Sequence, residues 1–208
     1  MQNKIKKILI YDVESTGLIK KGLNVYKDFD SYPEIIQLAH TIYDESQNKL
    51  YESNSYIRPV GFEVPKEVTE LIGIETSELI KVGLSLKYVL RHFISDLQKC
   101  DVIVGHNLGF DMNMIRSALL KLDIDITKID KMIKSKYSVD TMLASVDYCK
   151  IPSAPEHKKW SKYKWPKLEE LNNKLFNDEM ENAHNALSDV HYTSRCYFEL
   201  IKLNIIKL

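Results

Sequence analysis

Cysteine is scarce in this sequence, and no two cysteines have the Cys-X-X-Cys spacing of a metal-binding or redox pair. The three that occur, Cys100, Cys149 and Cys196, are far apart and odd in number. This usage argues against a small scaffold held together by disulfides. We therefore predict a reducing, cytoplasmic environment.

Net charge, long apolar runs and linker sequences are missing as well. Lys plus Arg and Asp plus Glu both number 29, so the chain is not a broadly basic nucleic-acid coat. The apolar run behind the first lysines is too short for a signal peptide and contains Asp12, and no run approaches the length of a membrane span. Because no Gly-, Ser- or Pro-rich linker divides the chain, we predict one domain over residues 1–208.

Two carboxylates continue a short apolar run near the N-terminus. The run Ile8-Leu9-Ile10-Tyr11 is typical of a buried strand, and Asp12-Val13-Glu14 follows it directly. Side chains alternate along a strand, so Asp12 and Glu14 point the same way, about 7 Å apart. Burying two unpaired carboxylates is costly unless cations neutralise them.

A second pattern, His106-Asn107-Leu108-Gly109-Phe110-Asp111, follows the apolar run 102–105 and opens a segment with helical spacing. One stripe of this predicted helix contains Asp111, Ile115, Ala118 and Leu122. Asp111 thus heads the face that packs on the sheet, where a third carboxylate can meet the first two.

A third pattern, His184-Asn185-Ala186-Leu187-Ser188-Asp189, begins the last predicted helix. His184 and Asp189 are five positions apart, so on a regular helix their side chains would point about 140° away from each other. His184 and Asp189 can therefore serve one site only if His184 lies at or just before the first turn. Its imidazole is the expected proton acceptor of the site.

Taken in order, these three patterns resemble those of the DEDDh exonucleases, the family of the proofreading subunits of replicative polymerases and their stand-alone relatives. Segments between the patterns also look familial: Pro33 to Ala39, Gly73-Ile74 and Ser138 to Met142. In a sister branch, a tyrosine lies four positions before the last aspartate. This chain has Asn185 there, and Tyr192 follows Asp189, so the histidine branch is favoured.

The order of predicted elements agrees with the α/β fold that the resemblance implies. Three strands in succession, followed by strands that alternate with helices, indicate an antiparallel meander extended by a parallel edge. We expect the ribonuclease-H-like fold, a mixed five-stranded sheet flanked by helices. The expected elements are strands at 7–13, 34–43, 49–58, 101–105 and near 138, and a helix from about 109.

The expected chemistry is phosphodiester hydrolysis at two divalent cations. Such a pair, about 3.5–4 Å apart, activates water and stabilises the charge of the leaving oxygen. Four carboxylates form a hard, oxygen-rich ligand set that suits Mg²⁺ or Mn²⁺. The expected ligands are Asp12, Glu14, Asp111 and Asp189, with Asp12 shared by both ions, and His184 is the expected general base.

The resemblance further implies contacts to the terminal nucleotide from Thr16, Gly17 and Leu18, with Asn107 and Phe110 shaping its pocket. Recognition of a free 3′ end would make the enzyme a 3′–5′ exonuclease that releases nucleoside 5′-monophosphates. Two alternatives rest on ordinary structure. Phe110 can be a core aromatic of its helix, and Thr16 can be a turn residue that satisfies backbone groups.

Two long segments are candidates for walls of the site. Residues 18–33 follow the first acidic pair directly and are expected to overhang it, and residues 150–166 can form a second wall. Within 157–167, five lysines alternate with three aromatic residues. This stretch either follows phosphates and stacks on bases through Trp160, Tyr163 or Trp165, or is a solvated loop.

The expected partner is a nucleic acid with a free 3′ end, single-stranded DNA in preference, and no membrane; no motif specifies a replication or repair partner. An exoribonuclease or oligoribonuclease with the same residues is one alternative, since contacts near the 2′ position decide between the sugars. A non-catalytic nucleic-acid-binding module is another, but it predicts the loss of a ligand. His40, His92 and His191 are expected to be structural, and His106 either orients the second pattern or packs.

Overall fold

A mixed five-stranded sheet forms the centre of the molecule, in the strand order β3-β2-β1-β4-β5. The computed structural model describes residues 6–154, 162–181 and 183–207. β1, β2 and β3 form an antiparallel meander, and β4 and β5 extend it in parallel, which confirms the predicted topology. The strands are β1 (Ile8–Ser15), β2 (Ile35–Tyr43), β3 (Lys49–Tyr56), β4 (Val102–Gly105) and β5 (Tyr137–Asp140).

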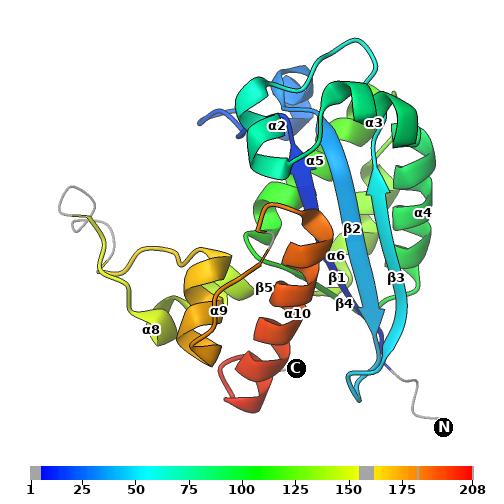
Figure 1. Ribbon diagram of the computed structural model, residues 1–208. Coiled ribbons are helices and arrows are strands. Elements are labelled where there is room, and N and C mark those ends of the chain that lie inside the picture. Colours follow the sequence, from blue (N-terminus) through cyan, green and yellow to red (C-terminus); the bar gives the residue numbers. More distant parts are fainter. Residues whose placement is uncertain (1–5, 155–161, 182, 208) are drawn as a thin grey trace, which may run out of the picture.

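Helices cover both faces of this sheet (Figure 1). The longest ones are α4 (Leu86–Gln98), α5 (Leu108–Lys121) and α10 (Ala186–Lys202). The shorter ones are α1 (Val25–Asp28), the 3₁₀ helix η1 (Phe29–Ser31), α2 (Lys66–Ile72), α3 (Thr76–Val82), α6 (Thr127–Lys134), α7 (Thr141–Ala144), α8 (Val146–Cys149) and α9 (Leu168–Phe176). In the described part of the chain, no helix combines the length and apolarity needed to span a membrane.

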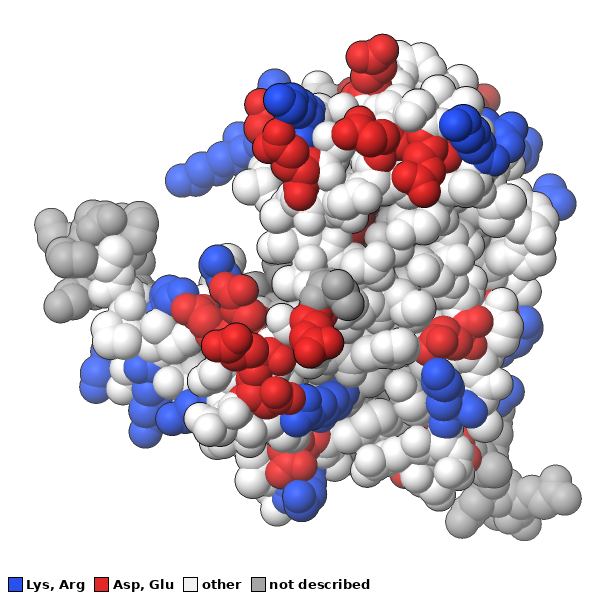
Figure 2. Space-filling view, viewed as in Figure 1, with Lys and Arg blue, Asp and Glu red and all other residues white. Residues whose placement is uncertain are grey.

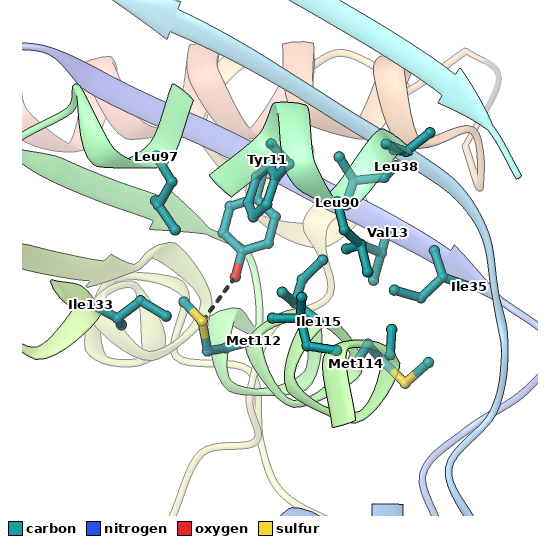
Figure 3. Close-up of a cluster of buried hydrophobic side chains, with 14 of the residues drawn as sticks. Tyr11, Val13, Ile35, Leu38, Leu90, Leu97, Met112, Met114, Ile115 and Ile133 are labelled. Atoms are coloured by element: carbon teal, nitrogen blue, oxygen red, sulfur yellow. Dashed lines mark hydrogen bonds between the residues drawn. The ribbon is translucent and has the colours of Figure 1, made fainter. Parts of the chain in front are cut away.

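The two faces of β1 belong to two different hydrophobic cores. Leu9, Tyr11 and Val13 pack with residues of α4 and α5, whereas Ile8 and Ile10 pack with residues of α10. In the first core, the Tyr11 ring lies 5.0 Å from the Phe93 ring, and its hydroxyl donates to Met112 Sδ (Figure 3). This strict alternation gives Asp12 and Glu14 the same direction as Ile8 and Ile10, as predicted.

The central strand extends beyond its parallel neighbour. β1 and β4 pair from Ile8 with Val102 to Ile10 with Val104, and β4 ends one residue later at Gly105. The chain then turns into α5, so the end of β1 has no strand on that side. Asp12 and Glu14 lie on this overhang, where side chains from α5 and α10 can reach them.

The ends of two strands differ from those predicted. β1 continues to Ser15 rather than stopping at 13, because an irregularity between Glu14 and Ser15 allows Ser15 to pair with Ile35. β3 ends at Tyr56 rather than 58, because Ile57 bridges to Leu84 instead. Cross-chain pairing decides both ends, and local pattern does not reveal it.

Segment 18–33, expected as a loop over the site, contains α1 and η1 and packs mainly on α5. The Ser117 hydroxyl donates to the Phe29 carbonyl oxygen at 2.9 Å, and Lys121 Nζ donates to the Tyr32 carbonyl oxygen at 2.8 Å. Tyr26 donates from its hydroxyl to Asp130 Oδ2 at 2.8 Å. Most of the segment therefore supports the first core rather than overhanging the carboxylates.

Candidate active site

The metal ligands and the histidine that were predicted from three separate patterns all line one cavity, of about 540 Å³. Asp12 and Glu14 come from β1, Asp111 from the first turn of α5, and His184 and Asp189 from the start of α10. These residues span most of the sequence. Only the fold brings them to the same end of the sheet.

Asp111 is held against β1 by a backbone hydrogen bond. Its side chain is 3% exposed, and Oδ1 accepts from the Val13 N–H at 3.3 Å. Along the same stripe of α5, Ile115 and Ala118 are buried in the core, as the helical spacing predicts. The apolar part of the helix thus anchors the carboxylate at its first turn.

The start of α10 is positioned by two side-chain caps. Asn185 accepts from the N–H groups of Leu187 at 3.2 Å and Ser188 at 3.4 Å, and is thus the N-cap. Gln37, on β2, accepts from the Ala186 N–H at 3.2 Å. The first turn of α10, which carries Asp189, is therefore tied to the sheet.

His184 lies just before this helix, as the pattern predicts. Its φ of 65° is in the left-handed region, and its side chain is exposed at the cavity. One ligand atom each from Glu14, His184 and Asp189 lies within 4.8 Å of the others. Asp12 and Asp111 line the same cavity without belonging to this trio.

Burial and mutual repulsion raise the pKa values of the carboxylates. The pKa of Asp12 is well above its usual range because of burial first, and then because of Asp111, Asp189 and Glu14. Burial, with the nearby charge of Asp189, raises the pKa of Glu14 to about 7. Every charged neighbour that shifts the pKa of either group is negative.

Asp111 and Asp189 follow the same trend. Burial raises the pKa of Asp111 well above its usual range, although the Val13 N–H opposes the shift. Burial raises the pKa of Asp189 to about 6, against a hydrogen bond from the His184 backbone. Four carboxylates crowded together at raised pKa values are typical of a functional site.

The donor set of the cavity fits divalent cations. Asp189 Oδ1 is buried and has no hydrogen-bond partner among the described residues. Such an oxygen is costly to bury unless a ligand satisfies it. Carboxylate oxygens are the ligands that hard cations such as Mg²⁺ and Mn²⁺ prefer. Asp12, Glu14, Asp111 and Asp189 are the residues that would hold such ions.

The family model of the exonucleases termed RNase_T matches residues 9–197 of the chain. The chain belongs to this family. The predicted class, a DEDDh 3′–5′ exonuclease, is thereby confirmed at the level of the domain, and with it a family that depends on divalent metals.

Curated relatives of the exonuclease domain include two much longer proteins. A PolC-type DNA polymerase III of Listeria welshimeri is 28% identical over 194 residues, which are 93% of this chain and 11% of the relative. That of Pediococcus pentosaceus is 27% identical over 139 residues, or 65% of this chain and 9% of the relative. The chain therefore spans about a tenth of the length of these relatives.

Solved structures establish the exonuclease fold. Escherichia coli exonuclease I in complex with a dT13 oligonucleotide superposes with a TM-score of 0.71 at 18% identity, over 94% of this chain and 41% of the other. A product-bound structure of exonuclease I gives a TM-score of 0.71 at 16% identity, over 97% of this chain and 45% of the other. The predicted ribonuclease-H-like fold is confirmed.

Three of the five predicted nucleotide contacts line the cavity of the exonuclease, namely Leu18, Asn107 and Phe110. Phe110 also packs against the first core, so both interpretations of it are compatible. Thr16 is a turn residue in the structure: its Oγ1 accepts from the Glu34 N–H, and its own N–H donates to the Glu34 carbonyl oxygen, both at 2.9 Å. Thr16 and Gly17 do not line the cavity.

The described part of segment 150–166, the second predicted wall, contributes residues to the cavity. Trp165 and Pro166, before α9, line the cavity, as does Lys167. The part of the lysine-rich stretch between His157 and Ser161, with Trp160, lies outside the described residues. From segment 18–33, by contrast, only Leu18 lines the cavity.

Several residues that hold the site together were not predicted. Gln37 is one, and Asp140 is another: its Oδ1 accepts from the N–H groups of Asn107 and Met142, both at 3.0 Å. The familial segments Ser138 to Met142 and Pro33 to Ala39 contain Asp140 and Gln37, but neither residue was given a role from sequence. Each acts on the backbone of a neighbouring pattern through tertiary contact.

His106 orients the second pattern, one of the two roles considered for it. Its Nδ1 lies 3.0 Å from Thr141 Oγ1, and its Nε2 lies 3.0 Å from the Pro166 carbonyl oxygen. Because a carbonyl only accepts, Nε2 carries a proton. Burial lowers the pKa of His106, although the bond to Pro166 opposes the shift. The His106 ring therefore links the end of β4 to the second wall.

The other histidines have structural partners, as expected. His40 Nε2 lies 3.1 Å from Asp96 Oδ2, His92 stacks on Tyr88, and His191 Nε2 lies 2.6 Å from Glu52 Oε2. Tyr192, which could have suggested the tyrosine branch, accepts from the Glu181 N–H at 2.9 Å and does not line the cavity. All three cysteines are buried free thiols.

Proposed function

We propose that this domain is a metal-dependent exonuclease that removes nucleotides from a free 3′ end of nucleic acid, with single-stranded DNA as the favoured substrate. Its products are nucleoside 5′-monophosphates. The observation that carries the proposal is the group of four carboxylates in one cavity, whose pKa values are raised by burial and by one another. Such a group requires cations, and an anionic substrate requires them as well.

The preference for DNA rests on the relatives. Two of them are DNA polymerase III proteins, and the exonuclease I structure contains a dT13 oligonucleotide. Both support DNA as the substrate. An exoribonuclease with the same carboxylates is the alternative to be tested.

The carboxylates have one task, which is to hold two divalent ions, Mg²⁺ or Mn²⁺. When bound, these ions neutralise the phosphate, promote ionisation of water and stabilise the leaving oxygen. The Val13 N–H fixes Asp111, and the Asn185 cap fixes the turn that carries Asp189. The ligand oxygens are thereby placed before any substrate arrives.

His184 accepts the proton of the attacking water. Water oxygen bonds to phosphorus, the bond from phosphorus to the 3′ oxygen breaks, and the nucleoside 5′-monophosphate leaves. The shortened strand keeps the 3′ oxygen, which takes a proton from solvent water to become a new 3′ hydroxyl. His184 fits this role because it is exposed at the cavity and close to Glu14 and Asp189. A general base must reach the proton it removes.

Degradation of end-labelled substrates tests the proposal. Single-stranded DNA and RNA of equal sequence, labelled at the 5′ end, are incubated with Mg²⁺, Mn²⁺ or EDTA. We expect a ladder of 3′-shortened DNA that requires metal and disappears in Asp12→Ala, together with a loss of roughly 10²-fold or more in His184→Ala. Near-native turnover of His184→Ala would remove it from its role.

The same assay separates the alternatives. Faster degradation of RNA than of DNA would favour the exoribonuclease. Binding without degradation under any metal condition would favour the non-catalytic module. Internal cleavage without 3′ shortening would contradict an exonuclease.

A further inference from the structure

We infer that Trp165 is a substrate-binding residue that stacks on a nucleobase of one of the last two nucleotides of the substrate. The inference rests on the proposed function and adds to it a residue that lies outside all three sequence patterns. Trp165 lines the same cavity as the carboxylates, yet it comes from the segment before α9.

The exposure of Trp165 is the first observation. This large aromatic side chain is 65% exposed. Leu18, which lines the same cavity, is 84% exposed. Large apolar side chains are normally buried, because leaving them in water forgoes the favourable free energy of burial. Two of them at the rim of one cavity indicate a surface that a ligand covers.

The backbone around Trp165 is held firmly, which is the second observation. The Pro166 carbonyl accepts from His106 Nε2 at 3.0 Å, and the Lys164 N–H donates to the Ile151 carbonyl oxygen at 2.9 Å. Tyr163 forms a bridge with Pro152. Trp165 is thus presented at the cavity by a fixed backbone, and His106 links that backbone to the second pattern.

The cavity is lined by charged carboxylates and by apolar side chains, and the two groups can bind different parts of a nucleotide. The carboxylates can act only on the phosphates, through cations. Trp165, with Leu18, Phe110 and Met142, supplies the apolar and aromatic lining. A base offers a π-face whatever its identity, so stacking on tryptophan suits an enzyme that degrades without regard to sequence.

The neighbouring lysines favour a base rather than a phosphate as the ligand of this wall. Lys164 Nζ pairs with Glu170, and Lys167 Nζ lies 3.2 Å from Glu169. Figure 2 shows acidic side chains gathered over α9 on the face in view. The positive charge next to Trp165 is therefore already compensated by the protein.

A substrate series tests the inference. Single-stranded DNA carries one abasic residue at position 1, 2, 3 or 4 from the 3′ end, and KM and kcat are measured for wild type and Trp165→Ala. We expect Trp165→Ala to raise KM about tenfold on intact DNA, the effect of losing one stacked base. That penalty should vanish when the abasic residue is at position 1 or 2. Trp165→Phe should restore most of the affinity.

The matched control is Tyr88→Ala. Tyr88 is an exposed aromatic residue of α4, 52% exposed, that does not line the cavity. It should behave as wild type on every substrate. An equal penalty on all substrates, a penalty that vanishes only at positions 3 or 4, or no penalty at all would overturn the inference. If wild type itself degrades nothing, the proposed function fails; if only the Trp165 pattern is absent, this inference fails alone.

Discussion

Two buried aspartates near α5 illustrate opposite ways of placing a carboxylate inside a protein. Asp130 is 8% exposed, and it pairs with Arg116 Nε at 2.8 Å and with the Tyr26 hydroxyl at 2.8 Å. Asp111 is 3% exposed and has the Val13 N–H as a partner, with other carboxylates around it. The first carboxylate is compensated by the protein. The second has no cationic partner among the described residues, which fits the proposed metal site.

This difference separates a structural role from a catalytic one. A compensated buried charge fixes the packing of its neighbours, and removing its partner is destabilising. An uncompensated cluster lowers the stability of the fold unless metal binds, and natural proteins retain such a cost mainly at functional sites. Equal substitutions at the two aspartates should therefore have opposite effects.

The largest expected effect is on activity. Asp111→Asn keeps the shape of the side chain but removes a proposed metal ligand, so turnover on single-stranded DNA should fall by roughly 10²- to 10³-fold or more. Asp130→Asn should retain turnover within a few-fold at a temperature where it is folded. Equal turnover of the two variants would contradict the comparison.

The next effect is on stability. Arg116→Met leaves Asp130 without its cation, and we expect a loss of about 3 kcal/mol in the free energy of unfolding, which urea denaturation would measure. Arg116→Met combined with Asp130→Asn should recover a large part of that loss. If the double variant is no more stable than the single one, the pair does not act as a unit.

Metal binding should stabilise the fold through the carboxylates of the cavity and not through the Asp130–Arg116 pair. At a free Mg²⁺ concentration of 100 times Kd, the wild type should gain about 2.7 kcal/mol, seen as a rise in Tm of several degrees. Asp130→Asn should show the same rise above its own lower Tm. Asp111→Asn should show little or none, and a full rise in that variant would place the ions elsewhere.

The smallest effect is on the pH dependence of stability without metal. The pKa values of Glu14 and Asp189, about 7 and about 6, are raised above those of the unfolded chain, so the folded state holds more protons between pH 4 and 7. This contribution is fully present below pH 4 and is lost as the pH rises to about 7. In EDTA, Tm measured against pH should therefore fall more steeply in wild type than in Glu14→Gln. Parallel curves would contradict the assigned shifts.

Much of the fold and the placement of the proposed metal ligands could be predicted from sequence because the signals are local. Alternation along β1 gave Asp12 and Glu14 one direction, and helical spacing placed Asp111 at the head of a buried stripe. His184 was expected just before its helix, and the structure confirms that position. Each inference needed only the geometry of a single element.

Contacts between different helices and strands could not be predicted from the geometry of single elements. The short helices in segment 18–33 are held on α5, where Ser117 and Lys121 donate to the carbonyl oxygens of Phe29 and Tyr32. Gln37 caps α10 from β2, across most of the chain. The sequence left open whether Trp165 stacks on bases or lies in a solvated loop; in the structure it is 65% exposed at the cavity, next to a backbone held at Pro166 by His106. Local sequence propensity does not show which residues remote in the chain will make such contacts.

By itself, the sequence determined on which face of which element the proposed catalytic side chains lie, because periods of two and 3.6 residues are properties of the backbone. Only the tertiary structure decided that β1 extends past β4, so that carboxylates from β1, α5 and α10 enter one cavity. Convergence depends on pairing register and helix packing, which are interactions between residues remote in the chain.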